Sequence, residues 1–413
     1  MKIKNILPYL LIILTIPSIA QWLNADMDNL TSLWWILYTL VLYLFISGKK
    51  HYFRAKNTPL FIKIFLFLVI LEALYGFTLA EGYYDYKFLI NNSFTFLLPL
   101  SIYYFSDPDS LSRALSKWFV VALPAFFLFI PVMQSEAIGK YLVPILFGLL
   151  FLKPLPLKNK IIVLLFFSFI FILGSLGSRS NVIKYFVALL MGLSLYTFVY
   201  RLKLIIRSLH LIIIFTPFVL LYLGMIGSFN VFKIDEYLSG DFDIEVQGAY
   251  DVDKVENLSS DTRTFIYEEA ILSAINENYV IQGNSLARGY KSKSFAFTDF
   301  YGRGERNASE VSIINVFTYF GILGVFTYFG IFLSATYKAI YKSNSTYMKV
   351  VGFYVTFRWF FAWIEDFSRF DLNYLFLWIM IAMCFSPQFR SMNNSQFEIW
   401  VRSIFVKYKV KNN

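Results

Sequence analysis

The sequence predicts an all-α polytopic membrane protein with about twelve transmembrane helices. Three observations lead to this fold class. Hydrophobic residues make up 58% of the 413 positions, and the mean hydropathy is +0.58. Charged residues make up only 15%, whereas about a quarter of the residues in a soluble globular chain are charged. Apolar runs recur along the chain and are separated by short links rich in lysine and arginine, as in multi-spanning membrane proteins.

The apolar runs predict where each span lies. A transmembrane helix needs about 20 mostly apolar residues, because the hydrocarbon core of a bilayer is about 30 Å thick. The first run follows Lys2 and Lys4 as in a signal peptide, but it lacks a clear cleavage site, so we expect it to be retained. The expected spans are 5–23, 31–47, 60–80, 88–105, 117–134, 138–152, 160–176, 180–200, 205–227, 311–336, 348–364 and 371–387.

The charges in the links predict an orientation. Lysine and arginine gather in every second link and in both tails, whereas the alternate links contain acidic residues such as Asp26, Glu81 and Glu136. Cationic links stay in the cytoplasm, so both termini are expected there. The resulting organisation is residues 1–227 with helices one to nine, 228–310 as one large outer loop with short helices, 311–387 with helices ten to twelve, and 388–413 as a basic amphipathic cytoplasmic tail.

The same composition excludes several classes of function. The net charge of +10 is spread over the links, where membrane orientation explains it, so no nucleic-acid partner is expected. Cys384 is the single cysteine, which rules out an internal disulfide framework. With only His51 and His210 as histidines, the chain offers little for a histidine-based metal site. We therefore expect neither a metal nor another cofactor.

Two arginines outside the cytoplasmic links are candidate site residues, because an ionisable group near membrane depth usually has a role. Arg179 opens a predicted helix that also carries Lys184, and its guanidinium could bind a phosphate with two parallel hydrogen bonds. The alternative is an interfacial arginine that contacts lipid headgroups. Ser260 or Asp261 would cap the N-terminus of a predicted helix that runs on to Ile275. Arg263 then lies in the first turn, where the helix dipole disfavours a cation, and this suggests contact with a ligand. The alternative is a surface ion pair with Asp261 or Glu268.

Further candidates follow in the loop and in the last spans. Arg288 lies in a glycine-punctuated turn, which is a weak signal by itself. Glu310 opens the tenth span, and a carboxylate that faces the membrane boundary is a candidate general base. The alternative for Glu310 is a simple acid at a helix N-terminus. Secondary candidates, for which structural ion pairs are an equal explanation, are Arg303, Arg306, Arg358, Glu365 and Asp366.

Three motifs follow one another along the chain. They are Gly177-Ser178-Arg179-Ser180, the Arg263 segment that runs into Gly283-Asn284-Ser285, and Glu310-Val311-Ser312 followed by Tyr319-Phe320-Gly321-Ile322-Leu323-Gly324. Taken in this order, they resemble the Wzy-type O-antigen polymerases and the related O-antigen ligases of bacterial inner membranes. The ligases usually carry a histidine where this chain has Glu310, and this difference favours a polymerase. Tyr267 stands where the family usually has a tryptophan.

The resemblance implies glycosyl transfer between two undecaprenyl-diphosphate-linked oligosaccharide repeats at the periplasmic face of the inner membrane. It also implies a chain-length regulator protein as a partner and requires no metal. Glu310, Arg263 and Arg179 would be the catalytic residues. Arg179, Arg263, Arg288 and Lys184 would bind the diphosphate.

Three other functions are open at this point. An O-antigen ligase would transfer the glycan to lipid A-core. A flippase for lipid-linked oligosaccharides, or another transporter, also has about twelve spans, but such proteins more often consist of two similar halves, and none are visible here. A membrane scaffold without chemistry would leave Arg179 and Glu310 unexplained.

Overall fold

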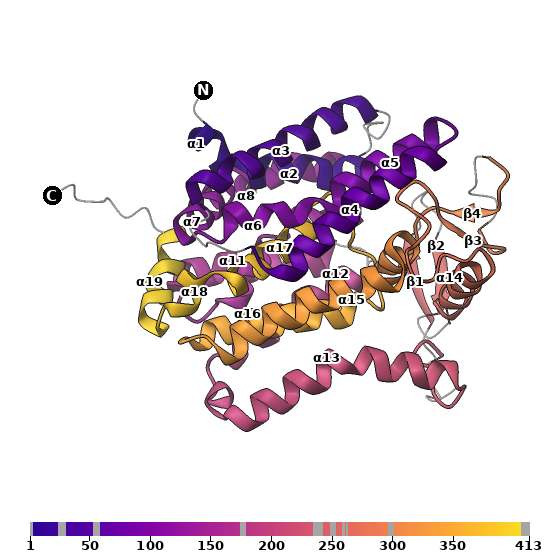
Figure 1. Ribbon diagram of the computed structural model, residues 1–413. Coiled ribbons are helices and arrows are strands. Elements are labelled where there is room, and N and C mark those ends of the chain that lie inside the picture. The colour runs from indigo at the N-terminus through magenta and orange to yellow at the C-terminus, as the bar shows by residue number, and fades with distance from the viewer. Residues whose placement is uncertain are drawn as a thin grey trace.

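The computed structural model describes residues 3–23, 30–52, 58–173, 179–233, 243–247, 253–257, 261, 263–295 and 301–405. Most of these residues are helical, and the strands form two small antiparallel sheets (Figure 1). The helices are α1 (Ile3–Ile6), α2 (Leu10–Ile19), α3 (Thr31–Tyr52), α4 (Leu60–Leu79), α5 (Tyr83–Phe96), α6 (Ile102–Phe105), α7 (Pro108–Lys117), α8 (Leu123–Phe129), α9 (Ser135–Tyr141), α10 (Ile145–Leu150), α11 (Leu157–Leu173), α12 (Arg179–Ser194), α13 (Lys203–Met225), α14 (Thr264–Asn276), α15 (Ser312–Tyr341), α16 (Thr346–Phe361), α17 (Leu372–Phe385), α18 (Pro387–Ser391) and α19 (Asn394–Phe405). The strands are β1 (Asp243–Gln247), β2 (Asp253–Asn257), β3 (Tyr290–Lys291) and β4 (Glu305–Arg306).

The predicted membrane character is confirmed. Among the described residues, six helical segments are long and apolar enough to cross a bilayer, and three shorter apolar helices accompany them. The protein is therefore a mostly helical membrane protein with little strand. The six segments are Thr31–Gly48, Leu60–Leu79, Tyr83–Phe105, Pro108–Val132, Lys203–Met225 and Ser312–Tyr341.

Some predicted spans are less regular than single helices. The stretch 138–152 forms two short helices, α9 and α10, with a turn at Leu142–Pro144 between them. Proline lacks the N–H group that a continuous helix would need at this point. Short 3₁₀ or π segments continue other helices, and they are Leu7–Tyr9, Ala20–Trp22, Leu98–Ser101, Trp118–Ala122, Ile130–Val132 and Val199–Arg201.

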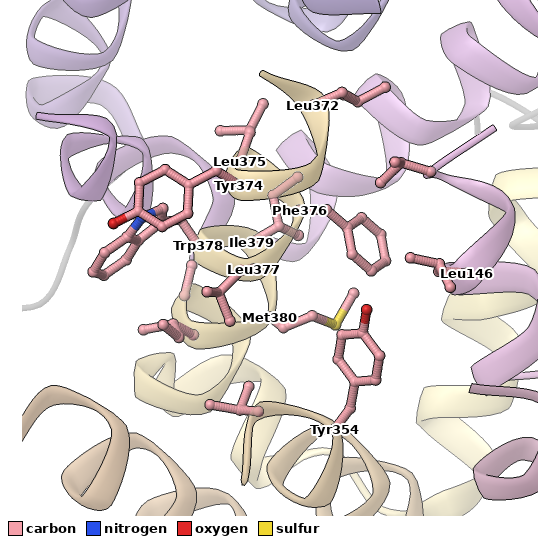
Figure 2. Packing of buried hydrophobic residues seen from close by; sticks show 14 of the residues in the cluster. Leu146, Tyr354, Leu372, Tyr374, Leu375, Phe376, Leu377, Trp378, Ile379 and Met380 are labelled. Carbon is pink, nitrogen blue, oxygen red and sulfur yellow. The ribbon is translucent and has the colours of Figure 1, made fainter. Parts of the chain in front are cut away.

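The centre of the bundle is α17. Apart from Asn373, every residue of this helix is buried, so the helix is surrounded by protein on all sides. Figure 2 shows the side chains of Trp378 and Tyr374 on one side of α17 and that of Phe376 on the other, toward Leu146. The core that positions the site is thus built around a short helix with no lipid-facing surface.

In contrast to the buried α17, helix α13 lies along one side of the bundle (Figure 1). It is attached mainly through α16 and α15. The indole Nε1 of Trp359 donates to the carbonyl oxygen of Ile214 at 2.9 Å, and the His210 ring lies within hydrogen-bond distance of Thr336 and Tyr341. The outward face of α13 is apolar and exposed, as expected for contact with lipid.

The segment 228–310 contains strands as well as the expected helix. Helix α14 and all four strands gather at one end of the bundle, which we call the α14 end (Figure 1). Strand β1 pairs with β2, and β3 pairs with β4, both antiparallel. This end of the molecule is therefore a small folded layer on the helices.

A glycine pair attaches this layer to α15. Gly321 interrupts α15 with φ 61° and ψ −161°, and Gly283 also has a positive φ of 92°. A Cβ atom on Gly321 would collide with the carbonyl oxygen of Ile281, and one on Gly283 would collide with the backbone of Tyr319. Because the backbone amide of Ile322 donates to the carbonyl oxygen of Val280 at 2.9 Å, the loop replaces hydrogen bonds that the interrupted helix loses. Both glycines of the sequence motifs thus have a structural role.

The C-terminal helix α19 lies in the expected amphipathic tail 388–413, of which residues 406–413 lie outside the described part of the chain. Its apolar side is buried against protein instead of facing lipid alone. The ring of Phe397 stacks on Tyr347 with the centroids 5.2 Å apart, and the Trp400 indole donates to the carbonyl oxygen of Pro108 at 2.9 Å. The helix therefore closes the end of the bundle opposite to α14.

Candidate functional site

A cavity of about 630 Å³ lies at the α14 end of the bundle. It brings together residues that are far apart in the sequence, including several of the predicted site residues. The predicted residues in its lining are Lys184, Arg263, Glu310, Arg358, Glu365 and Asp366. Further lining residues are Trp22, Glu136, Lys140, Ser180, Asn181, Phe265, Phe295, Phe361, Phe367, Arg369, Asp371 and Asn373.

Arg263 lies immediately before α14, not in its first turn as predicted, and it faces two carboxylates. Its Nη1 donates to Glu310 at 2.6 Å, and its Nη2 lies 3.6 Å from Glu365. Its Nε donates to the carbonyl oxygen of Ile364 at 3.2 Å, so every part of the guanidinium is directed toward the cavity wall. Asp261 positions the start of the helix by accepting the backbone amides of Arg263 at 3.0 Å and Thr264 at 2.9 Å.

Glu310 is less desolvated than the sequence suggests. We expected a carboxylate that faces membrane, yet its side chain is 51% exposed at the cavity entrance. Arg263 and Arg306 approach it from two sides, the latter at 3.4 Å. The carboxylate is therefore accessible to a substrate and already aligned by two guanidinium groups.

Two cations deeper in the cavity share one hydrogen-bond acceptor. Arg358 is 1% exposed and Lys184 is 3% exposed, and both donate to the same amide oxygen of Asn373, at 3.1 and 3.4 Å. Among the described residues, the Nε and Nη2 atoms of Arg358 have no hydrogen-bond acceptor. Its guanidinium instead lies 4.1 Å from the centroid of the Phe367 ring. Buried donors without acceptors are energetically unfavourable, so this part of the cavity is suited to an anion.

The link between α16 and α17 supplies the carboxylates. Burial raises the pKa of Glu365, and Arg263 only partly opposes this effect. Asp366 accepts a hydrogen bond from the Ser312 hydroxyl at 3.1 Å and another from the backbone amide of Ser368 at 2.9 Å. The two neighbouring carboxylates thus have different environments within one wall.

The remaining predicted residues fall into two groups. Arg179 is the first residue of α12, but its side chain lies outside the described part of the structure; its neighbours Ser180 and Asn181 line the cavity. Arg288, Arg303 and Arg306 are not in the cavity lining.

Arg288 and Arg303 instead connect the layer at the α14 end to α4 and α5. Arg288 donates to Glu81 and to the carbonyl oxygen of Leu79, both at 3.0 Å. Arg303 forms an ion pair with the buried Asp85 at 2.5 Å. These contacts hold the layer on the helices.

A second cavity, of about 490 Å³, adjoins the first. The two share Lys140, Asp366, Arg369 and Asp371 in their linings. Rings and amides dominate the rest of the second cavity, including Trp34, Tyr38, Phe370, Asn91 and Asn92. Sequence reasoning did not select these residues or Lys140. Polar residues such as Asn91 within an apolar run were the only signal that could have indicated them.

The arrangement can bind an anionic group beside an accessible carboxylate at the end of a membrane-embedded bundle. No group of three or more histidine, cysteine or acidic residues within the described ranges is placed to hold a metal ion. Compared with known proteins, the chain matches no protein-family model, no curated protein and no solved structure.

Proposed function

We propose that the protein is a membrane glycosyltransferase that polymerises a surface polysaccharide, as the Wzy-type O-antigen polymerases do. One observation carries the proposal. Ser180, Arg263 and Glu310 come from the three separate motifs of the sequence resemblance, and all three line the same cavity. Motifs that were recognised independently along the chain are therefore neighbours in space, as expected for parts of one site.

The proposal includes a topology of twelve spans with both termini in the cytoplasm. The alternation of cationic and acidic links supports this orientation. It assigns the α14 end to the periplasmic side of the inner membrane. Lipid-linked oligosaccharides would then reach the cavity from the outer leaflet.

In the proposed reaction, the bond between the first sugar carbon of the growing chain and its undecaprenyl diphosphate breaks. A hydroxyl oxygen of the incoming repeat forms the new bond to that carbon, and Glu310 accepts the hydroxyl proton. Arg263, Arg358 and Lys184 stabilise the negative charge that develops on the departing diphosphate. Because Arg263 already holds Glu310 at 2.6 Å, a bound diphosphate would compete for the guanidinium and release a carboxylate oxygen for the proton.

The second cavity favours transfer over transport. A polymerase must hold two lipid-linked oligosaccharides at once, with their reacting atoms adjacent. Two cavities that share Lys140, Asp366, Arg369 and Asp371 provide such a junction.

The proposal is tested in a strain that lacks its own copy of the gene. We expect Arg263→Ala and Glu310→Gln to leave only single repeats on the cell surface, because polymerisation fails while export continues. Arg113→Ala serves as the control, since Arg113 is exposed on α7, far from the cavity. Long-chain polysaccharide from both variants at matched expression would refute the proposal, and complete loss of exported repeats would favour a flippase.

A further inference from the structure

A third cavity, of about 360 Å³, lies beside the proposed active site between α13, α14 and α16. Its lining is mostly apolar. Helix α13 contributes Pro217, Leu220, Leu221, Gly224 and Met225, and α14 and the end of α16 contribute most of the other side.

A single wall separates this cavity from the cation-lined one. Ile364 lines the apolar cavity, and its carbonyl oxygen accepts the hydrogen bond from Arg263 Nε at 3.2 Å. Thr264, the next residue in the chain after Arg263, also lines the apolar cavity. If the anionic group of a ligand binds Arg263, the apolar cavity therefore begins at the neighbouring residues Thr264 and Ile364.

Two polar side chains of the wall are already engaged, whereas the indole Nε1 of Trp363 has no hydrogen-bond partner among the described residues. The Tyr267 hydroxyl donates to the carbonyl oxygen of Trp363 at 2.6 Å, and the Asn230 amide donates to Thr264 at 2.7 Å. Glu268 is the one charged side chain in the described lining. These contacts leave mainly apolar surface for an occupant.

The cavity is bordered by surface that suits contact with lipid. Met225, at the end of α13, is 71% exposed, and Leu272 on α14 is 57% exposed. Helix α13 is one of the helices long enough to cross the membrane, and its C-terminal end forms this border. An apolar chain could thus pass from the bilayer to the cation-lined cavity without crossing water.

We propose that this cavity binds the first part of the polyprenyl chain of the lipid-linked substrate, with the diphosphate at Arg263. The inference rests on the proposed function, because it specifies how the same site holds its lipid. It predicts that the protein distinguishes a polyprenyl diphosphate from inorganic diphosphate through residues that contact neither the diphosphate nor the sugar.

Gly224→Leu is the critical variant. A Cβ atom at Gly224 would meet only the carbonyl oxygen of Phe229, at 3.9 Å, so a leucine side chain can enter the cavity without a backbone clash. Leucine also favours a helix more than glycine does. Leu272→Asn is a second variant that places an amide in the path of the chain. Val219→Phe is the matched control, because Val219 is 53% exposed on the same helix and does not line the cavity.

The experiment measures binding of undecaprenyl diphosphate and of inorganic diphosphate to the full-length protein purified in detergent. We expect Gly224→Leu to weaken the binding of undecaprenyl diphosphate by about tenfold, which is the loss expected for about two methylene groups of apolar contact. Leu272→Asn should weaken the same binding several-fold. Inorganic diphosphate should bind all variants equally, and Val219→Phe should change neither affinity.

Unchanged binding of undecaprenyl diphosphate to Gly224→Leu would overturn the inference, as would equal weakening by Val219→Phe. Weaker binding of inorganic diphosphate to Gly224→Leu would also overturn the inference, because the effect would then not be specific to the polyprenyl chain. The proposed function can fail separately. If Arg263→Ala and Glu310→Gln cells make normal polysaccharide while Gly224→Leu still selectively weakens undecaprenyl diphosphate, the lipid site holds and the polymerase assignment does not.

Discussion

Arg358→Met should stabilise the ligand-free protein and weaken its binding of diphosphate. Arg358 is 1% exposed, and two of its guanidinium nitrogens lack acceptors among the described residues. Each unsatisfied buried donor costs about 1–3 kcal/mol, and removing both relieves roughly 2–6 kcal/mol. The variant loses one hydrogen bond to Asn373, worth about 1.5–3 kcal/mol for a charged donor, and the contact with the Phe367 ring, worth about 2 kcal/mol. It also removes the desolvation cost of a buried charge. Methionine has a similar length and adapts to an irregular apolar site, so the balance favours the variant.

The effect on binding has the opposite sign. If the two nitrogens are reserved for an anion, the variant loses at least one charge-assisted hydrogen bond, and the affinity for inorganic diphosphate should fall by roughly ten- to a hundredfold. Arg358→Lys is the control, because it keeps the charge but not the planar fork. It should bind diphosphate more tightly than Arg358→Met.

The assay is thermal unfolding of the purified protein with and without inorganic diphosphate. Diphosphate should raise the melting temperature of the wild-type protein more than that of Arg358→Met, because at a given concentration a ligand that binds the folded state more tightly stabilises it more. A lower melting temperature for Arg358→Met without diphosphate, combined with unchanged binding, would refute the reasoning. Arg358 would then be a structural cation.

Three further substitutions test other parts of the structure. Glu310→Gln should retain diphosphate binding but lower the polymerisation rate by about a hundredfold or more, measured as glycan chain length; normal chain length would contradict a general-base role. Gly321→Ala should lower the melting temperature strongly because its Cβ collides with the Ile281 carbonyl oxygen, whereas Gly227→Ala, with a similar φ of 70° but no neighbour within 4 Å, should cost only about 1 kcal/mol. Burial opposes ionisation of Glu269, but hydrogen bonds from Ser292, Ser294 and Lys293 outweigh it and lower its pKa. This stability is present above the unfolded pKa of about 4.3 and is lost as the pH falls below it. Melting temperatures measured between pH 6 and pH 3 should therefore decline less for Glu269→Gln than for the wild-type protein, and equal slopes would exclude this contribution.

Hydropathy predicted the lipid-facing helices well. Helices α4 and α13 agree with the spans 60–80 and 205–227 within a few residues, because a lipid-facing helix needs a long apolar run. The interruption of α15 at Gly321 was not predictable in this way. It depends on the loop around Val280, which supplies a replacement hydrogen bond, and hydropathy contains no information about such a partner.

The candidate site was also predictable only in part. Arg263, Glu310 and Arg358 stood out in the sequence because a charge is conspicuous near membrane depth, and the structure places all three in one cavity. Arg288 was a weaker signal, and it is paired with Glu81 outside the lining. This partner was too distant in the sequence to identify. Lys140 was not selected from the sequence, although it lies 4.0 Å from the centroid of the Trp22 ring and lines two cavities.

The link between α16 and α17 connects the proposed steps. Ile364 faces the apolar cavity, Glu365 faces the cation-lined cavity, and Asp366 faces both that cavity and the second one. The link is also firmly held: the Ser312 amide at the start of α15 donates to the carbonyl oxygen of Glu365 at 3.3 Å, and Asp371 at the other end accepts the backbone amide of Tyr374 at 2.8 Å.

A segment fixed at both ends keeps its side chains in constant relative positions, which a site that joins two large substrates requires. Small changes within this link should therefore affect lipid binding, anion binding and the second cavity together. Changes in α13 should affect the lipid alone.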